Sequence, residues 1–230
     1  MQLTFVEDCQ QRSPIMTTKS VLPDAMPTVF VVDDDEYVRE ALETLIEVAG
    51  WHARTFASAD GFLACPPATG ASCLVLDVNL PGLNGLDLQT AIAGERGDMP
   101  VIFITGAGDI PMSVRAMKAG AAEFLTKPFG EEVMLDAIRA ALERSQAAVG
   151  DQANLQALRD SYAALSPRER QVMAGVVSGR MNKQVGGDLG ITEITVKKHR
   201  GRVMEKMRAR SLAELVNMST SLGLSTSVKG

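Results

Sequence analysis

The sequence predicts two domains of different class: a doubly wound α/β domain with a (βα)5 parallel sheet, followed by an all-α domain of four helices. Three observations support this division. The chain has 230 residues, more than one small domain usually contains. From residue 28, short β-branched runs alternate with helical patterns, whereas the chain after about residue 164 shows helical patterns only. Residues 1–150 contain 10 Lys+Arg and 21 Asp+Glu, a net charge of −11, but residues 151–230 contain 13 and 7, a net charge of +6.

Residues 1–27 precede the first strand pattern. They are rich in Ser, Thr, Pro and Gln and show no periodicity, which predicts a disordered leader. Met16 and Met26 could each begin a protein, so we expect an extended start. The leader has no apolar run like that of a signal peptide, and no stretch of the chain approaches 18 apolar residues. We therefore expect a cytoplasmic protein without a membrane segment.

The three cysteines, Cys9, Cys65 and Cys73, are odd in number. They lie at none of the short paired spacings that bind zinc or form a disulfide framework. We expect them to be reduced and to have no chemical role.

Five strand patterns alternate with five helical patterns between residues 28 and 146. The strands are TVFVV, HARTF, CLVLD, PVIFIT and AEFLT, and the helices begin near Glu36, after HARTF, near Asn84, near Asp109 and near Gly130. Gly120 is expected to end the fourth helix. This alternation predicts a parallel sheet whose ligands bind at the carboxyl ends of the strands, beside the point where strand order reverses.

Polar side chains are placed at four of these strand ends. Residues 33–35 are three aspartates directly after the first strand, and Asp77 ends the third. Carboxylates this close repel one another, and a hard divalent cation such as Mg²⁺ (or Mn²⁺) relieves the repulsion. Thr105 and Lys127 follow the fourth and fifth strands and could hold an anion against the metal. Each residue alone has an ordinary structural explanation, but together they predict phosphoryl transfer to a carboxylate.

Three strings in this region carry a family resemblance. They are VVDDDEYVREAL, LVLDVNLPGLNGLDL and ITGAGDIPMSVRAMKAGAAEFLTKPF. They resemble the flavodoxin-like receiver domain of two-component response regulators, and the third is similar to the FixJ/NarL subgroup. The resemblance implies that Asp77 accepts a phosphoryl group from a sensor histidine kinase. It also implies a magnesium site formed by Asp33 (largely through water), Asp34, Asp77 and the backbone carbonyl of Asn79, and it leaves Asp35 without a role.

The same resemblance implies a conformational switch. Lys127 would pair with the phosphoryl group, and the Lys127–Pro128 peptide would be cis, a geometry that only an X-Pro bond adopts at low cost. Thr105 and Phe124 would form the switch pair: the phosphoryl group draws the Thr105 hydroxyl inward, and Phe124 turns into the space. Homodimerisation on phosphorylation would then use the fourth helix and fifth strand. The alternative is that Phe124 is ordinary core packing.

Residues 147–163 are expected to form a helical or partly flexible linker that continues the fifth helix. In the domain at 164–230, helix starts are predicted at four capping signals: Ser166 with Glu169, Asn182, Thr192, and Ser211 with Glu214. The four helices would run to about Val177, Leu189, Arg208 and Leu222, with a turn at Gly190–Ile191. Four helices with one tight glycine turn predict a helix-turn-helix domain.

The third of these helices is expected to have an apolar inner face and a basic outer face. A step of 100° per residue places Val196, Val203 and Met207 inward. The same step places Ile194, Lys198, Gly201 and Glu205 outward. Lys197 and Lys198 are the expected base readers, and other cations would contact phosphates. The predicted DNA-binding residues are Lys183, Thr195, Lys197, Lys198, Arg200, Arg202 and Lys206.

The stretch LSPRERQVMAGVVSGRMNKQVGGDLGITEITVKKHRGRVMEKMRARSLAELV resembles the LuxR-type helix-turn-helix that is fused to such receivers. The resemblance implies double-stranded promoter DNA and RNA polymerase as partners. Two departures stand out. Gly186-Gly187 replaces an expected alanine-like residue, and each glycine costs about 1 kcal/mol relative to alanine. Gly201 stands where a larger DNA-contacting side chain is expected.

A phosphorylation-controlled transcriptional regulator, rather than an enzyme, explains both domains. One alternative is a phosphatase that works through an aspartyl phosphate, but such chemistry usually needs a second acid two residues after the nucleophile, where this chain has Asn79. The other alternative is an adaptor whose C-terminal helices bind protein or RNA. Salt-sensitive binding to duplex DNA distinguishes it from a transcriptional regulator.

Overall fold

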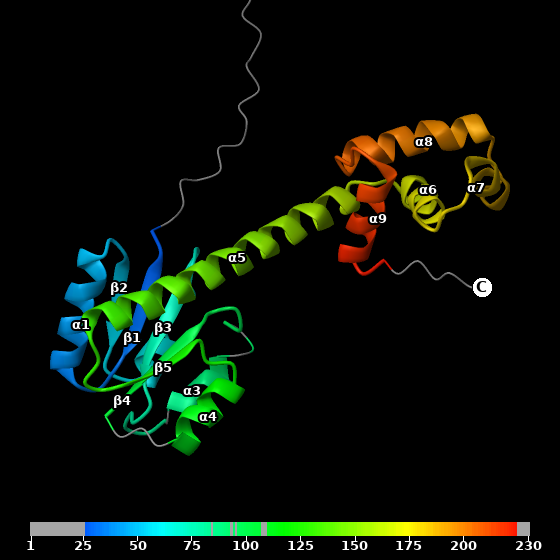
Figure 1. The fold of residues 1–230 in the computed structure, drawn as a ribbon. Helices are drawn as coiled ribbons and strands as arrows, with labels where there is room; N and C mark the ends of the chain where they lie inside the picture. The colour runs from blue at the N-terminus through cyan, green and yellow to red at the C-terminus, as the bar shows by residue number, and fades with distance from the viewer. Residues whose placement is uncertain (1–25, 84, 93, 95, 107–109, 225–230) are drawn as a thin grey trace, which may run out of the picture.

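The structure is a computed structural model that describes residues 26–224, apart from 84, 93, 95 and 107–109. The expected leader lies outside the described residues except for its last two, Met26 and Pro27. The alternative start at Met16 and the cysteine at Cys9 also lie outside them. Figure 1 shows an α/β domain and an all-helical domain that are joined by one long helix, α5.

The α/β domain is built on five parallel strands in the order β2-β1-β3-β4-β5. The strands are β1 (Thr28–Val32), β2 (His52–Phe56), β3 (Ser72–Asp77), β4 (Val101–Thr105) and β5 (Glu123–Thr126). The three inner strands are almost wholly buried, as is typical of a parallel sheet covered on both faces. Strand order reverses between β1 and β3, so the switch point lies beside the end of β3. The predicted doubly wound fold is confirmed.

Helices cover both faces of the sheet (Figure 1). They are α1 (Glu36–Val48), α2 (Ala59–Leu63), α3 (Gly85–Ile92), α4 (Ile110–Lys118) and the first part of α5 (Glu131–Ala163). Ile46 of α1 and Ile138 of α5 belong to one core cluster, whereas Phe62, Leu88 and Ala116 of the other three helices belong to the second. Gly120 has a φ of +90° two residues after the end of α4, so the predicted helix end is confirmed.

Helix α5 continues without a break for 33 residues, through the whole of the segment 147–163 expected to be a linker. Its first half is anchored in the α/β domain, where Met134 and Ile138 are fully buried. Its last turns belong to the second domain, where Leu158 and Tyr162 pack against the core. Of the two conformations left open by the sequence, the structure shows the helical one.

Up to residue 224, where the description ends, the second domain contains four helices: α6 (Pro167–Val177), α7 (Asn182–Leu189), α8 (Glu193–Lys206) and α9 (Leu212–Ser221). The Ser166–Glu169 capping box begins α6, and the Thr192 hydroxyl accepts the Thr195 N–H at the start of α8. Gly190 is in the left-handed region between α7 and α8, with a φ of +64°. The predicted helix-turn-helix domain is confirmed.

Two helix ends and one capping hydrogen bond differ from the sequence predictions. Helix α7 is capped at Met181 rather than at Asn182, because the Gln184 side chain accepts the Met181 N–H at 2.8 Å. Helix α8 ends at Lys206, before Arg208, because Arg208 adopts a φ of +57°. At the last helix, Glu214 accepts the N–H of Arg210 rather than that of Ser211.

The two adjacent glycines of α7 have different surroundings. A Cβ atom on Gly186 would lie 2.7 Å from the carbonyl oxygen of Ile191, so the helix and the following turn approach closely there. A Cβ atom on Gly187 would meet nothing within 4 Å. Glycine lowers helix stability at both positions. At Gly186 the missing side chain permits a close packing contact, whereas at Gly187 it permits no such contact.

Gly187→Ala is expected to stabilise the C-terminal domain by about 1 kcal/mol, because alanine is the better helix former and has room for its methyl group. Native-state hydrogen exchange of the α7 and α8 amides measures the change. The control is Gly179→Ala, which should destabilise the same domain because Gly179 has a φ of +82°. Unchanged protection in Gly187→Ala would contradict the prediction.

Candidate functional sites

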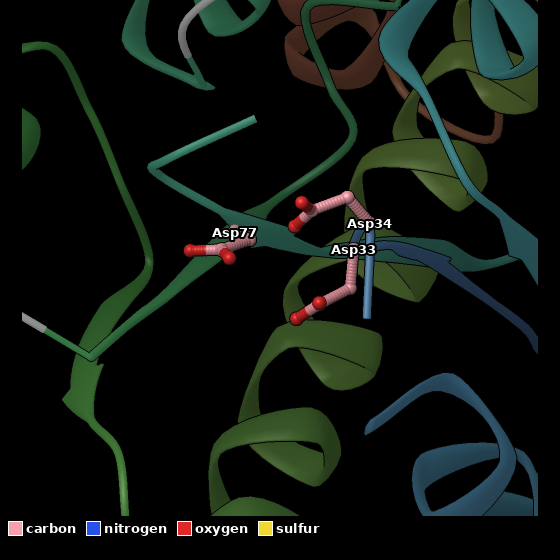
Figure 2. A group of neighbouring side chains, drawn as sticks. All are labelled: Asp33, Asp34 and Asp77. Carbon is pink, nitrogen blue, oxygen red and sulfur yellow. The ribbon is translucent and has the colours of Figure 1, made fainter. Parts of the chain in front are cut away.

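An acidic cluster lies at the carboxyl end of the sheet, at the switch point. Asp33 follows β1 and Asp77 ends β3, and these two strands are paired in register up to Val32 and Leu76. Asp33 and Asp77 are buried, whereas Asp34 is exposed. Each of the three side chains offers a carboxylate oxygen, and these oxygens all lie within 4.8 Å of one another (Figure 2).

Lys127 brings a positive charge to this cluster from the loop after β5. Its Nζ lies 2.6 Å from Asp33 Oδ2 and 3.4 Å from Asp77 Oδ2. Its backbone N–H donates to the carbonyl oxygen of Thr105 at 2.7 Å, which ties the loop to the end of β4. The Lys127–Pro128 peptide is cis, as the family resemblance implied.

Burial and charge pairing have opposite effects on the two partners of this ion pair. Burial raises the pKa of Asp33, and the hydrogen bonds from Lys127 and from the Asp35 N–H only partly offset this effect. Burial alone would lower the pKa of Lys127, but the attraction of Asp33 and Asp77 outweighs it, so the pKa is raised. Lys127 is therefore held as a cation against the carboxylates.

Asn79 connects the carboxylate of Asp77 to the hydroxyl of Thr105. Its backbone N–H donates to Asp77 Oδ1 at 3.2 Å, and its side-chain Nδ2 donates to Thr105 Oγ1 at 3.2 Å. Thr105 is fully buried. The structure thus places all of the predicted residues, Asp33, Asp34, Asp77, Asn79, Thr105 and Lys127, around one rim.

Phe124 is on the side of the sheet that α4 covers. It pairs in register with Phe103 on β4, and the two ring centroids lie 6.4 Å apart. Phe124 is half-buried and packs against the core that contains Ala116 of α4. Thr105 lies two residues beyond Phe103 and therefore on the same face of the sheet.

Three supporting residues were not assigned roles from the sequence. Arg39 donates through Nη1 to the carbonyl oxygens of Asp33 and Asp34, at 2.8 and 2.9 Å, and so fixes the acidic loop. The Asp35 carboxylate caps α1 by accepting the Tyr37 N–H. A Cβ on Gly85 would lie 2.6 Å from the carbonyl oxygen of Asp77, so α3 begins directly behind the site. An arginine one turn into the helix after an aspartate run was the available signal for Arg39.

The donor set of the cluster fits a hard divalent cation. It offers three carboxylates, which are the oxygen ligands that Mg²⁺ prefers, and one of them is exposed toward solvent. Asp33 and Asp77 are tied to backbone N–H donors through one oxygen each. The residues present are therefore suited to such an ion, and Lys127 provides the nearby cation for an anionic ligand.

The predicted DNA-binding residues gather on α7 and α8. The exposed residues among them are Lys183, Lys197, Lys198, Arg202 and Lys206, and the half-buried ones are Thr195 and Arg200. On the opposite face of α8, Val196, Val203 and Met207 are buried, as the helical periodicity predicted. Arg200 Nη1 donates to Asn182 Oδ1 at 3.4 Å, which links the two helices.

Lys206 differs from the other cations because it pairs with a buried carboxylate of its own domain. Its Nζ lies 2.8 Å from Oε2 of the buried Glu169 and 3.1 Å from the carbonyl oxygen of Ala164. The same Glu169 carboxylate accepts the Ser166 N–H of the capping box at 2.8 Å. The contact joins the end of α5, the start of α6 and the end of α8, a role that the sequence did not indicate.

Acid is expected to destabilise the C-terminal domain through Glu169. The hydrogen bonds from Lys206 and from the Ser166 N–H lower the pKa of Glu169 to about 2, from an ordinary value of 4.5. As the pH falls through 4.5, Glu169 takes up a proton in the unfolded chain but not in the folded domain. The free energy of unfolding that this carboxylate contributes is therefore fully present above pH 4.5 and is lost as the pH falls toward 2. Chemical denaturation at several pH values measures this slope. Glu169→Gln should flatten it, and equal slopes in both proteins would refute the assignment.

The fold and the two sites together define a regulatory protein that combines a receiver-type α/β domain with a helix-turn-helix domain. Family models match both parts: the response regulator receiver domain matches residues 29–139, and the bacterial regulatory proteins of the LuxR family match residues 163–219. Within residues 26–224, where these are described, no helix is long and apolar enough to cross a membrane.

Similar proteins share this two-part organisation. Nodulation protein W of Bradyrhizobium diazoefficiens is 52% identical over 86% of this chain and 87% of its own length. The transcriptional regulatory protein FixJ of Rhizobium meliloti is 41% identical over 87% of this chain and 98% of its own. The response regulator StyR has a solved structure that covers 85% of this chain and 99% of its own, with 46% identity and a TM-score of 0.77. The chain belongs to the two-component response regulators with a LuxR-type DNA-binding domain, and it is a transcriptional regulator.

Proposed function

We propose that Asp77 is the phosphoacceptor of this regulator and that a sensor histidine kinase is the donor. The observation that carries the proposal is the position of the Asp77 carboxylate, with Oδ2 3.4 Å from Lys127 Nζ, beside Asp33 and Asp34. A carboxylate oxygen would form a bond to phosphorus as the bond to the histidine nitrogen breaks, and the nitrogen would leave with the electron pair. Lys127 would then neutralise the transferred group.

A magnesium or manganese ion would be held by Asp33, Asp34 and Asp77, with the backbone carbonyl of Asn79 as a further ligand. Such an ion neutralises charge on a transferring phosphoryl group. The residues themselves provide the remaining functions: Arg39 fixes the loop of Asp33 and Asp34, and Lys127 orients the group.

A groove next to the acidic cluster supports docking of the kinase. It has a volume of about 430 Å³ and lies between α1 and the start of α5. Its lining residues include Tyr37, Ala41, Leu45 and Phe129. Lys127 lines the groove and also contacts Asp77, so a protein seated in the groove would reach the phosphoacceptor.

Thr105 and Phe124 form the proposed switch. A phosphoryl group on Asp77 would compete with the Asn79 side chain for the Thr105 hydroxyl, which now accepts the Asn79 amide at 3.2 Å. Movement of Thr105 would open space on the side of the sheet where Phe124 packs. The output surface would be α4 and β5, where Val114 and Met117 are exposed apolar residues. A second copy covering this surface would give the homodimer.

Phe124→Ala is expected to weaken phosphorylation-dependent dimerisation at least tenfold while leaving phosphorylation intact, because Phe124 packs in the core beside Phe103 and is not one of the residues of the acidic cluster. Sedimentation velocity with and without a phosphodonor measures the effect. The matched control is Phe56→Ala, a half-buried phenylalanine on the far edge strand β2. If Phe124→Ala dimerised on phosphorylation as well as the wild-type protein, Phe124 would be ordinary core packing.

The DNA-contacting residues are proposed to be Lys197 and Lys198 for the bases, and Lys183, Thr195, Arg200 and Arg202 for the backbone. Their placement on α7 and α8 supports this, since cations on the second helix of the motif enter the major groove. Lys206, which Glu169 holds, is proposed to position α8 rather than to contact DNA. RNA polymerase is the further partner expected of a promoter-bound regulator, and the cytoplasm is its expected location.

The proposal is tested by transferring phosphate from a panel of autophosphorylated sensor kinases to the full chain and measuring promoter binding before and after. Phosphorylation at Asp77 with a rise in affinity for a genomic duplex supports it. Failure of both forms to bind any duplex would favour the adaptor alternative. Rapid turnover of the phosphoryl group, rather than slow dephosphorylation, would favour a phosphatase.

A further inference from the structure

The outward row of α8 contains an apolar side chain that the fold does not use. Ile194 is the second residue of α8 and is 80% exposed. The buried residues of this helix, Val196 and Val203, lie on the opposite face. A β-branched side chain is also a poorer helix former than alanine or lysine, so helix stability does not explain an isoleucine there.

The charges along the same row indicate which end of α8 meets a polyanion. Ile194 is followed on this face by Lys198, then Gly201, then Glu205, all exposed. Glu205 would repel phosphates at the C-terminal end, where Lys206 is already paired with Glu169. At the N-terminal end Lys197 pairs with Glu193 at 3.6 Å, whereas no ion pair of Lys198 is found in the described part of the chain. The N-terminal half therefore faces DNA.

Gly201 allows a close approach of this half of the helix. It is exposed, and a Cβ atom placed on it would meet nothing within 4 Å, so no side chain holds the helix away from the groove at that point. Ile194 lies four residues before Lys198, which is about 6 Å along the helix axis. That distance corresponds to about two base-pair steps of 3.4 Å.

We infer that Ile194 is a base-reading residue that contacts the C5-methyl group of a thymine in the major groove. An alkyl side chain has no hydrogen-bond donor or acceptor, and the thymine methyl is the apolar group on the base edges of that groove. The thymine would lie about two base pairs from the base that Lys198 reads. This inference rests on the proposed DNA contacts of α8 and deepens them by naming the base class recognised at one position.

The probe is a duplex selected from a random-sequence library by the phosphorylated full-length protein. Each thymine of the selected duplex is replaced in turn by deoxyuridine, which removes only the methyl group. At one thymine position per half-site, the deoxyuridine duplex is expected to bind the wild-type protein about fourfold more weakly than the thymine duplex, which is the effect of one buried methyl group. Ile194→Ala should bind the thymine duplex about fourfold more weakly than wild type and should no longer distinguish the deoxyuridine duplex.

Two further variants separate a base contact from a structural effect. Ile194→Val keeps two methyl groups and should keep the discrimination. Met181→Ala removes another exposed apolar side chain, at the start of α7, and should also keep it. The inference alone would be overturned if a specific duplex were selected but no thymine-to-deoxyuridine replacement weakened its binding. It would also be overturned if Ile194→Ala still distinguished the thymine duplex from the deoxyuridine duplex. Recovery of no preferred duplex at all would overturn both it and the proposed DNA contacts.

Discussion

Asp77→Asn is expected to incorporate no phosphoryl group from acetyl phosphate and Mg²⁺, whereas the wild-type chain becomes labelled. An amide cannot supply the carboxylate nucleophile. Of the other two carboxylates of the rim, Asp33 is fully buried with Oδ2 already paired to Lys127 at 2.6 Å, and Asp34 makes no ion pair within the described residues. The complete loss of label is measured by intact mass spectrometry or by electrophoresis that resolves the phosphorylated form. Phosphorylation-dependent dimerisation should be lost with it.

Asp35→Asn is the matched control for this experiment. Asp35 is adjacent to the rim, but its carboxylate caps α1, and asparagine is an equally good capping residue. Labelling of Asp35→Asn should therefore equal that of wild type. Equal labelling of Asp77→Asn would assign the phosphoryl group to another residue, and Asp34 would be the first to examine because it is the exposed member of the cluster.

Joint replacement of Lys197 and Lys198 by alanine is expected to weaken binding to the preferred duplex roughly 30-fold or more, since each good base contact contributes about 1–3 kcal/mol. Both side chains are exposed on α8, so the domain should keep its stability. Fluorescence anisotropy at several salt concentrations measures the loss, and comparison with a scrambled duplex separates base reading from phosphate attraction.

The matched control removes the same number of charges elsewhere. Arg144 and Arg159 are exposed on α5, outside the two helices α7 and α8. Their joint replacement by alanine should change affinity for the preferred duplex less than threefold. If the two double variants lost affinity equally, the contribution of α8 would be general electrostatic attraction. If the lysine variant lost nothing, another surface would bind DNA.

The continuous α5 helix places a further physical constraint on how the two sites communicate. The carbonyl oxygens at its end are held by the second domain: Arg170 donates to that of Ala163 and Lys206 to that of Ala164. In its first half, Met134 is fully buried in the receiver domain, and the Oγ of Ser145 accepts the Ser72 N–H. Both ends of the helix are thus part of a folded domain, so a movement of the receiver end carries directly to the domain that contains α8.

Local chain patterns predicted the elements and most of the receiver site. The alternation of strands and helices places Asp33, Asp77, Thr105 and Lys127 at strand ends, and a parallel sheet brings all such ends to one edge. Caps and glycine turns are likewise properties of neighbouring residues, which is why the Ser166 box, Thr192 and Gly190 were found from the sequence. The error at Met181 was of one residue: the Gln184 side chain accepts the Met181 N–H there.

The sequence by itself determined the class of both domains, the order of their elements and the residue types at the phosphoacceptor rim. Only the tertiary structure decided which partners these residues have. Lys127 pairs with Asp33 across 94 residues, and Lys206 pairs with Glu169 across 37. The close contact at Gly186 also became visible only in the folded chain. The physical reason is that periodicity and capping act between chain neighbours, whereas burial and ion pairing depend on how distant segments pack.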